Sequence, residues 1–263
     1  NSGTITLNGA VNTFVAAVSF LDTDTVTLGT SAFNGGVTFT AATPIVLQRA
    51  ITTSGAVDFL AGGVTLTANS SVATTIGNAA GGAITFGAGI TDGAGTFNLA
   101  LDAGTGGAVT VATTTAINDL TLTQAASNTF TGNVTVNDLI TTANSGTITL
   151  NGAVNTFVAA VDFLNTGLVT LGDAGTDSST FTGGVAFSGN AASALQGAFV
   201  TTNTLADFGT GGVTLGADTT ITTGAGAGNI AFGAGITGAF DLGLDAGTGA
   251  VTVATTTNIT DLT

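Results

Sequence analysis

Short runs in which apolar residues alternate with a single intervening residue recur along the whole chain. In the first half, a primary series of such runs has starts separated by 21, 19, 19, 20 and 25 residues: Ile5–Leu7, Val26–Leu28, Ile45–Leu47, Val64–Leu66, Ile84–Phe86 and Val109–Val111. Secondary runs lie between them at Val18–Phe20, Val37–Phe39 and Val57–Phe59. Alternation with a period of two residues predicts β-strands whose apolar side chains face inward and whose middle residue, usually Thr, faces outward.

The segments between these runs are rich in Gly, Asn, Asp and Ala, which favour turns. Strands this short cannot bury a face by themselves, but they can when successive coils stack on one another. The sequence therefore predicts an all-β fold, a right-handed parallel β-helix (β-solenoid) of roughly a dozen coils, with about 20 residues per coil and about 4.8 Å between coils. Inward aromatic ladders are also expected, because five phenylalanines each precede a V-x-[FV] run by four residues: Phe14, Phe33, Phe130, Phe157 and Phe181.

A long internal duplication underlies the short repeats. Residues 1–29 and 144–172 differ at only four positions, and matching segments continue to the end of the chain. The second copy ends at Asp261–Thr263, which corresponds to Asp119–Thr121. We expect a first long repeat at 1–143 and a second, truncated repeat at 144–263. They would form one continuous rod that belongs to a longer tandem array.

The composition excludes several classes of protein. The chain has no Cys, His, Met, Trp or Tyr, its fifteen acidic residues are all Asp, and Arg49 is its only basic residue, which gives a formal net charge of −14. Without a basic patch, nucleic acid is not an expected partner. No stretch of about 18 apolar residues occurs, so we expect no membrane insertion of this segment. The absence of Cys leaves stability to repetition rather than to disulfides.

Catalysis has few candidate groups in this chain. Paired carboxylates can hydrolyse glycosides, and three Asp pairs are close in sequence: Asp22/Asp24, Asp173/Asp177 and Asp241/Asp245. The first pair is replaced by Asn165 and Gly167 in the second copy, which favours a solubilising role. We therefore expect no enzyme, no catalytic residue and no cofactor-binding residue.

Calcium is the metal that Asp and backbone oxygens would suit best. The segment Gly87–Gly93 departs from the frame of a calcium-binding nonapeptide array, and its Asp92 is replaced by Gly238 in the second copy. The sequence DAGTG does recur, at 102–106 and 245–249. On balance no metal site is expected.

Threonine pairs of the form T-x-T are frequent: Thr4/Thr6, Thr25/Thr27, Thr65/Thr67, Thr121/Thr123 and Thr147/Thr149. Ranks of this kind could bind ice, but irregular coil lengths argue against a lattice match. Thr also simply favours strands. A surface of small side chains loses little conformational entropy on contact, and exposed strand edges at solenoid ends can pair with further strands. Association between copies is therefore the favoured use of these faces.

The segment 120–136, LTLTQAASNTFTGNVTV, resembles the autotransporter-associated β-strand repeat. In that repeat an L-T-L run is followed by N-T-[YF]-x-G and a Val-rich strand. Degenerate copies occur at Ile5–Leu7 with Asn12–Phe14 and at Ile148–Leu150 with Asn155–Phe157. The chain departs from the repeat at Phe130, where Tyr is common, and in lacking Gly around Ala125. As a whole it is similar to the large filamentous-haemagglutinin-like exoproteins of bacteria, which implies export to the cell surface or matrix and a role in adhesion or as fibre material.

Together these observations lead us to expect a secreted or cell-surface structural protein, such as a fibre of an extracellular or biofilm matrix, that associates with itself end to end or laterally. An alternative is the passive stalk or binding region of an adhesin that recognises surface glycans or a host. An Asp-based polysaccharide hydrolase is a remote third alternative.

Overall fold

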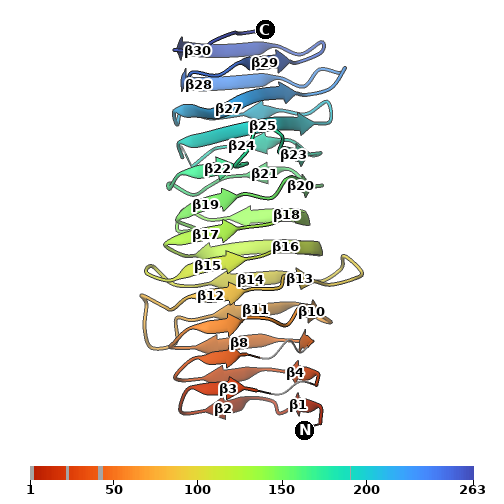
Figure 1. Cartoon of the computed structure of the whole chain (residues 1–263), viewed down its shortest axis with the longest axis vertical. Coiled ribbons are helices and arrows are strands. Elements are labelled where there is room, and N and C mark those ends of the chain that lie inside the picture. Colours follow the sequence, from red (N-terminus) through yellow and green to blue (C-terminus); the bar gives the residue numbers. More distant parts are fainter. Residues whose placement is uncertain (1–2, 22–23, 41–43, 190) are drawn as a thin grey trace. The chain divides into compact units, whose positions relative to one another are not determined.

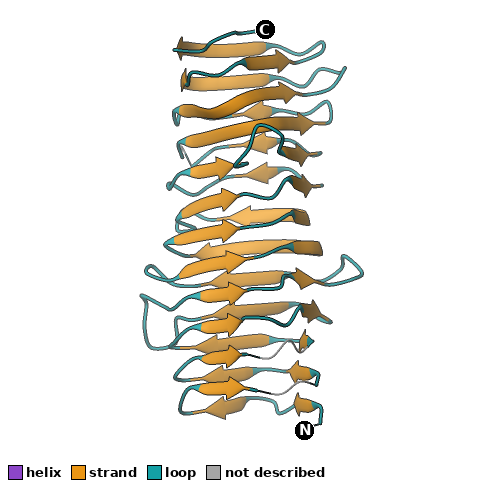
Figure 2. Cartoon of the chain, in the orientation of Figure 1, coloured by secondary structure: helices purple, strands orange, loops and turns teal. Residues whose placement is uncertain are grey.

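The chain forms an all-β parallel β-solenoid of about 12 turns with roughly 21 residues per turn. The computed structural model describes residues 3–21, 24–40, 44–189 and 191–263, and these residues form strands and connecting loops without a helix (Figures 1 and 2). The predicted fold class, coil number and coil length are confirmed. The right-handed sense of the coil stays a prediction.

The chain divides into two compact units, which we call unit 1 (Asn1–Thr131) and unit 2 (Gly132–Thr263). In each unit the strands of successive coils pair in parallel and form three sheet faces. Face 1 holds the V-x-L runs, face 2 the runs that follow them, and face 3 the V-x-F runs. The division into long repeats at 1–143 and 144–263 stays a prediction. So does the continuous rod that these repeats would form.

Among the described residues of unit 1 the three faces are built from seventeen strands, with β16 (Thr114–Gln124) contributing to two of the faces. Face 1 contains β1 (Ile5–Leu7), β4 (Val26–Leu28), β7 (Ile45–Leu47), β10 (Val64–Leu66), β13 (Ile90–Thr91) and the start of β16. Face 2 contains β2 (Asn12–Phe14), β5 (Ser31–Phe33), β8 (Ala50–Thr53), β11 (Ser70–Ala73), β14 (Leu99–Asp102) and the end of β16. Face 3 contains β3 (Val18–Phe20), β6 (Val37–Phe39), β9 (Val57–Phe59), β12 (Ile84–Phe86), β15 (Ala108–Val111) and β17 (Ser127–Phe130).

Unit 2 has the same arrangement, but several of its strands are longer and turn a corner between two faces. Face 1 contains β19 (Thr147–Leu150), β22 (Val169–Leu171) and parts of β25 (Ser193–Thr201), β27 (Val213–Thr222), β28 (Ile230–Thr237) and β30 (Val251–Thr257). Face 2 contains β18 (Val134–Thr141), β20 (Val154–Phe157), β23 (Ser178–Phe181), β29 (Leu242–Asp245) and the ends of β25 and β27. Face 3 contains β21 (Val161–Asp162), β24 (Val185–Ala186), β26 (Ala206–Asp207) and the starts of β28 and β30.

One feature of the predicted strand order is wrong. The primary series placed Ile84–Phe86 in line with Val64–Leu66, but β12 pairs with Val57–Phe59 of face 3. The strand that continues face 1 is β13, in which Ile90 pairs with Val64. The reason is the ten-residue loop 74–83, which lengthens this coil before face 3 begins, whereas only Ser54–Ala56 join face 2 to face 3 in the coil before it.

Phenylalanine rings stack inside unit 1 in the direction in which the coils stack. The longest ladder runs through the V-x-F strands of face 3, where Phe20, Phe39, Phe59 and Phe86 stack with centroid distances of 4.8, 5.0 and 4.7 Å. These distances match the spacing of parallel strands, about 4.8 Å. Each of these four coils therefore adds one ring to the ladder, and Phe39, Phe59 and Phe86 are fully buried.

Unit 2 repeats this ladder at the residues that the duplication matches. Phe163, Phe187, Phe208 and Phe232 stack with centroid distances of 4.8, 5.4 and 4.7 Å. The predicted ladders are confirmed in part: Phe14 stacks on Phe33 and Phe157 on Phe181. Phe130 is fully buried but stacks on no other ring among the described residues. In unit 1 the four-ring ladder is formed instead by the three secondary runs, Val18–Phe20, Val37–Phe39 and Val57–Phe59, together with Phe86 of the primary series.

Glycine is required at one corner of both units. Gly36 in unit 1 and Gly184 in unit 2 precede face 3 and have φ values of +98° and +100°, a region that L side chains rarely enter. A Cβ atom at either position would also lie 2.8 Å from a carbonyl oxygen of the next coil, that of Ala56 or Leu205. The two copies therefore turn this corner by the same backbone geometry.

Candidate functional site

The outward surface of face 1 carries a rank of threonines in unit 1. Strand pairing places Thr6, Thr27, Thr65, Thr91 and Thr115 at the same outward position of successive coils, with Val46 in the one remaining coil. The pairing is in register, so the side chains follow one another at the coil spacing. We call this row the threonine rank.

Unit 2 has an equivalent threonine rank, and the one coil that lacks Thr at this position is the equivalent coil of the repeat. Thr149, Thr170, Thr214, Thr237 and Thr257 are aligned by strand pairing, and Ala194 takes the place that Val46 has in unit 1. The predicted T-x-T pairs therefore do not form a single surface. Thr121, in particular, lies on face 2, where it pairs with Ala100, because β16 turns the corner between the two faces.

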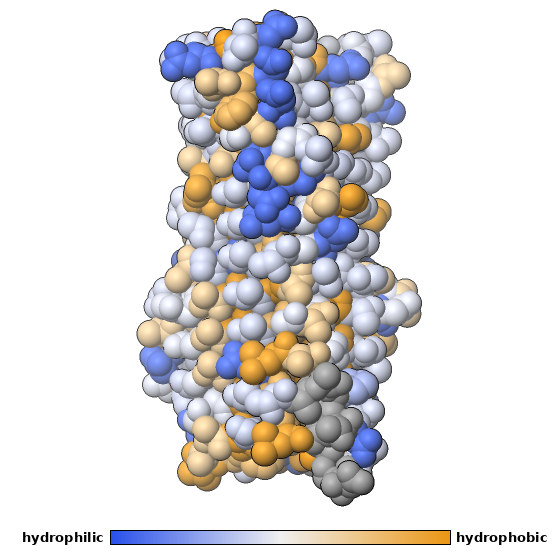
Figure 3. Space-filling model, in the orientation of Figure 1, coloured by the Kyte–Doolittle hydropathy of each residue, from blue (hydrophilic) through white to orange (hydrophobic). Residues whose placement is uncertain are grey.

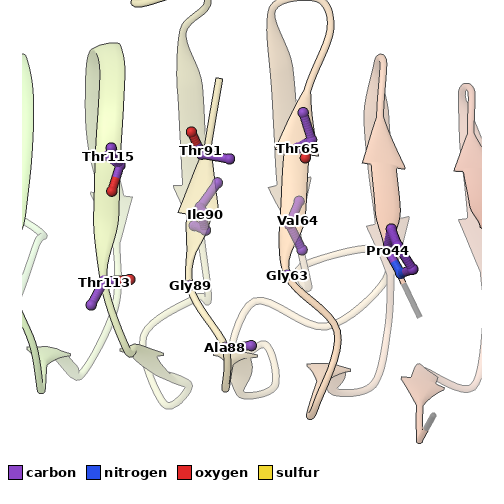
Figure 4. Close-up of a pocket in the computed structure, with 10 residues that line it drawn as sticks. All are labelled: Pro44, Gly63, Val64, Thr65, Ala88, Gly89, Ile90, Thr91, Thr113 and Thr115. Atoms are coloured by element: carbon purple, nitrogen blue, oxygen red, sulfur yellow. The ribbon is translucent and has the colours of Figure 1, made fainter. Parts of the chain in front are cut away.

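A groove runs beside the threonine rank of unit 1 and has a cavity volume of about 410 Å³. Figure 4 shows Gly63 and Gly89 directly before the neighbouring strands β10 and β13, with Pro44 before β7 on one side and Thr113 before β16 on the other. The two glycines leave a gap in the outward row next to the rank, and Thr65 lies along its edge. The groove can accept a side chain from another molecule, but it contains no titratable group.

The two glycines of this groove should respond differently to substitution. A Cβ at Gly63 has no atom within 4 Å, whereas Gly89 has φ +100° and its Cβ would collide with the Thr113 side chain. We expect Gly63→Thr to change the free energy of unfolding by less than about 0.5 kcal/mol and Gly89→Ala to lower it by about 1–2 kcal/mol. Urea unfolding of both variants measures this difference, and equal losses would contradict it.

The Asp residues of the recurring DAGTG segments hold turns. Asp102 Oδ1 accepts the backbone N–H of Gly104 at 3.0 Å, and Asp245 Oδ1 accepts that of Gly247 at 2.9 Å. Both carboxylates thus satisfy the backbone two residues further along, as in an Asx turn. Among the residues that the structure describes, no group of three acidic side chains is placed to hold a metal ion.

The three Asp pairs considered for catalysis differ in their surroundings. Asp177 is 5% exposed, and its Oδ2 accepts the backbone N–H groups of Asp173 and Ala174 at 2.7 and 2.9 Å. Asp241 and Asp245 are exposed at either end of β29. In the first pair, Asp22 lies outside the described residues. Asp177 therefore supports a loop, with one oxygen already occupied by two donors.

Both carboxylate oxygens of Asp92 accept backbone hydrogen bonds, four in all. Its Oδ1 accepts the N–H groups of Ala94, at 2.8 Å, and Gly95, and its Oδ2 accepts those of Thr96 and Phe97 at 2.7 and 2.6 Å. The residue is 6% exposed. In unit 2 the same corner is three residues shorter, and Gly238 occupies the matching position. The carboxylate therefore binds the backbone of an inserted loop. Comparing the two copies could have revealed this role, because Asp92 occurs only in the copy with the longer loop.

A second groove, of about 380 Å³, lies at the corner of unit 1 between faces 1 and 2. Its polar lining residues are Thr30, Arg49, Asn69, Ser70, Ser71, Asn98 and Thr121. Arg49 is exposed, and within the described ranges no carboxylate forms an ion pair with it. The sequence pattern did not indicate this groove, because its residues come from five different coils.

The comparisons with known proteins give this chain no relatives. No family model, curated protein or solved structure matches it. No helix that could cross a bilayer occurs in the residues that the structure describes. Structurally, the chain is identified as a parallel β-solenoid with threonine ranks on face 1 of each unit and polar grooves on unit 1.

Proposed function

We propose that this chain is part of a structural cell-surface or extracellular-matrix fibre that associates with further copies of itself, laterally or end to end. The observation that supports the proposal is the threonine rank, which appears in both units with its interruption in the same coil. Its neighbours on face 1 are mostly Gly, Ala and Thr, so the face is built from small side chains.

Contact between two protein faces costs side-chain conformational entropy. Small and β-branched side chains have few rotamers to lose when two faces meet, whereas each long side chain costs up to about 2 kcal/mol of conformational entropy. The chain has only one long charged side chain, Arg49. Its faces can therefore pack against one another at low entropic cost. The resemblance to bacterial β-strand-repeat exoproteins adds the expectation of an extracellular location.

Lysine substitutions on the threonine rank test the proposal. Thr214 and Thr237 are exposed, so Thr214→Lys and Thr237→Lys should leave the fold intact. We expect wild type to form filaments or bundles as its concentration rises, and the double variant to assemble at least about tenfold less readily, because two flexible side chains must be ordered at the contact. Sedimentation velocity and electron microscopy measure both.

Ala227→Lys is the matched control, because Ala227 is exposed in the turn between Gly224 and Gly228 rather than on a face. It should assemble like wild type. Monodisperse wild-type particles at high concentration would contradict self-association altogether. Unchanged assembly of the double variant would remove the threonine rank from the contact.

A further inference from the structure

The Arg49 groove of unit 1 is rich in hydrogen-bond donors. Asn69 Oδ1 accepts the backbone N–H of Asn98 at 3.0 Å, so the Asn69 side-chain amide still has its NH₂ group to donate. The guanidinium of Arg49 adds five N–H donors, and both residues are exposed. The groove therefore presents a cation and an amide donor one coil apart.

A hydrogen-bonded ladder supports this corner of unit 1. Asn98 Nδ2 donates to Asp119 Oδ2 at 2.8 Å, and Asn118 Nδ2 donates to Asn98 Oδ1 at 2.8 Å. Strand pairing places Asn69, Asn98 and Asp119 in three successive coils. Arg49 lies in the coil before Asn69, one position out of line with this row because Ala50 pairs with Ser71, and Asp119 is the one carboxylate of the row.

Unit 2 has three carboxylates at the matching positions. Asp218, Asp241 and Asp261 follow one another in successive coils, since the backbone N–H of Asp241 donates to Asp218 Oδ1 at 3.0 Å and that of Leu242 to the Asp261 carbonyl oxygen at 2.9 Å. All three are exposed. Arg49 is replaced by Gly197 in this copy. We call this row the acidic corner.

The two units as a whole also differ in their numbers of charged residues. Unit 1 has six Asp residues and Arg49, whereas unit 2 has nine Asp residues and no basic residue. In the view of Figure 3, hydrophilic residues gather over strands of unit 2, and small or apolar residues cover much of unit 1. Any side-chain ion pair that unit 2 forms with another copy must therefore use Arg49.

We propose that the Arg49 groove of one copy binds the acidic corner of a second copy. This inference rests on the proposed self-association and names one of its contacts. Both surfaces run along the direction of coil stacking with the same repeat of about 4.8 Å, so a guanidinium fork can contact two successive carboxylates. The side-chain amide of Asn69 can donate to the next carboxylate of the acidic corner. Because the two surfaces differ, the contact is heterologous, and it propagates into an open assembly when the rotation between copies does not close.

Chemical labelling of Arg49 tests this contact in the unmodified chain. Phenylglyoxal reacts with arginine side chains, and this chain has only one, so mass spectrometry reports the accessibility of a single guanidinium. We expect the labelling rate to fall at least about fivefold between dilute protein and assembled protein, and to recover at high salt, which screens exposed ion pairs.

Matched substitutions identify the occupant of the groove. Asp241→Asn should weaken association about tenfold and keep Arg49 reactive at high concentration. Asp58→Asn makes the same charge change on face 3 of unit 1, away from both corners, and should not weaken association. Arg49→Asp combined with Asp241→Arg should restore association that either change alone reduces.

Three outcomes would overturn the inference. Assembly with an unchanged labelling rate would remove Arg49 from the contact while leaving the proposed function in place. Protection of Arg49 in dilute protein by an acidic polysaccharide, to the same degree as in assembled wild type, would make a glycan the occupant. Wild type that remains monomeric at every concentration would contradict both the contact and the proposed function.

Discussion

Replacing Phe59 by Ala is expected to lower the free energy of unfolding by about 3–5 kcal/mol. The Phe59 ring is fully buried between Phe39, at a centroid distance of 5.0 Å, and Phe86, at 4.7 Å. Its removal eliminates two stacking contacts. It also leaves a void, which can be filled only if the neighbouring strands β6 and β12 shift. Urea unfolding followed by circular dichroism measures the loss.

Phe20 provides the matched control within the same ladder. Its ring is half-buried and stacks on Phe39 alone, with an edge contact to Phe33. Phe20→Ala should therefore cost clearly less than Phe59→Ala. Phe208→Ala, which removes the corresponding ring of unit 2, should cost as much as Phe59→Ala. Equal losses at Phe20 and Phe59 would show that stacking between coils does not determine the stability of the ladder.

The second large effect is expected at Asp92. Asp92→Ala removes the acceptor of four backbone N–H groups in a carboxylate that is 6% exposed. Unsatisfied donors and lost charge-assisted hydrogen bonds should lower the free energy of unfolding by about 2–4 kcal/mol. The loss stays in this range because water can reach part of the released loop and bind some of the donors. Hydrogen exchange of the amides at 94–97 should rise before that of the neighbouring strands.

Asp245 is the control for Asp92, because it is exposed and accepts one N–H, from Gly247. Asp245→Ala should cost less than about 1 kcal/mol. The loss in free energy of unfolding for Asp92→Asn should lie between those of Asp92→Ala and Asp245→Ala, since an amide has only one oxygen to replace the two of the carboxylate. Unchanged exchange at 94–97 in Asp92→Ala would mean that packing alone holds this loop.

The strands themselves could be predicted from sequence because their signal is local. The runs Val26–Leu28 and Val57–Phe59 form strands with the predicted inward and outward residues. Each alternation depends only on residues two positions apart, so it survives without knowledge of what the strand packs against. The duplication similarly indicated which residues of the two copies should have equivalent surroundings.

Alignment between coils was harder to predict, because it depends on the length of every corner. Ile84 was assigned to the wrong face since the loop 74–83 adds residues whose effect on register no local pattern reveals. The Arg49 groove was missed for the same reason, since Arg49, Asn69 and Asn98 become neighbours only after the coils have stacked.

By itself the sequence determined the fold class, the approximate coil length and the make-up of the surface, whose side chains are small and whose charged residues are almost all Asp. The tertiary structure decided which phenylalanines form the four-ring ladders, that Asp92 binds a loop rather than solvent, and that Asn69, Asn98 and Asp119 in one copy correspond to three stacked carboxylates in the other. The physical reason is the distance along the chain. Alternation acts between residues two apart, whereas stacking joins residues about 20 apart, whose alignment depends on all the turns between them.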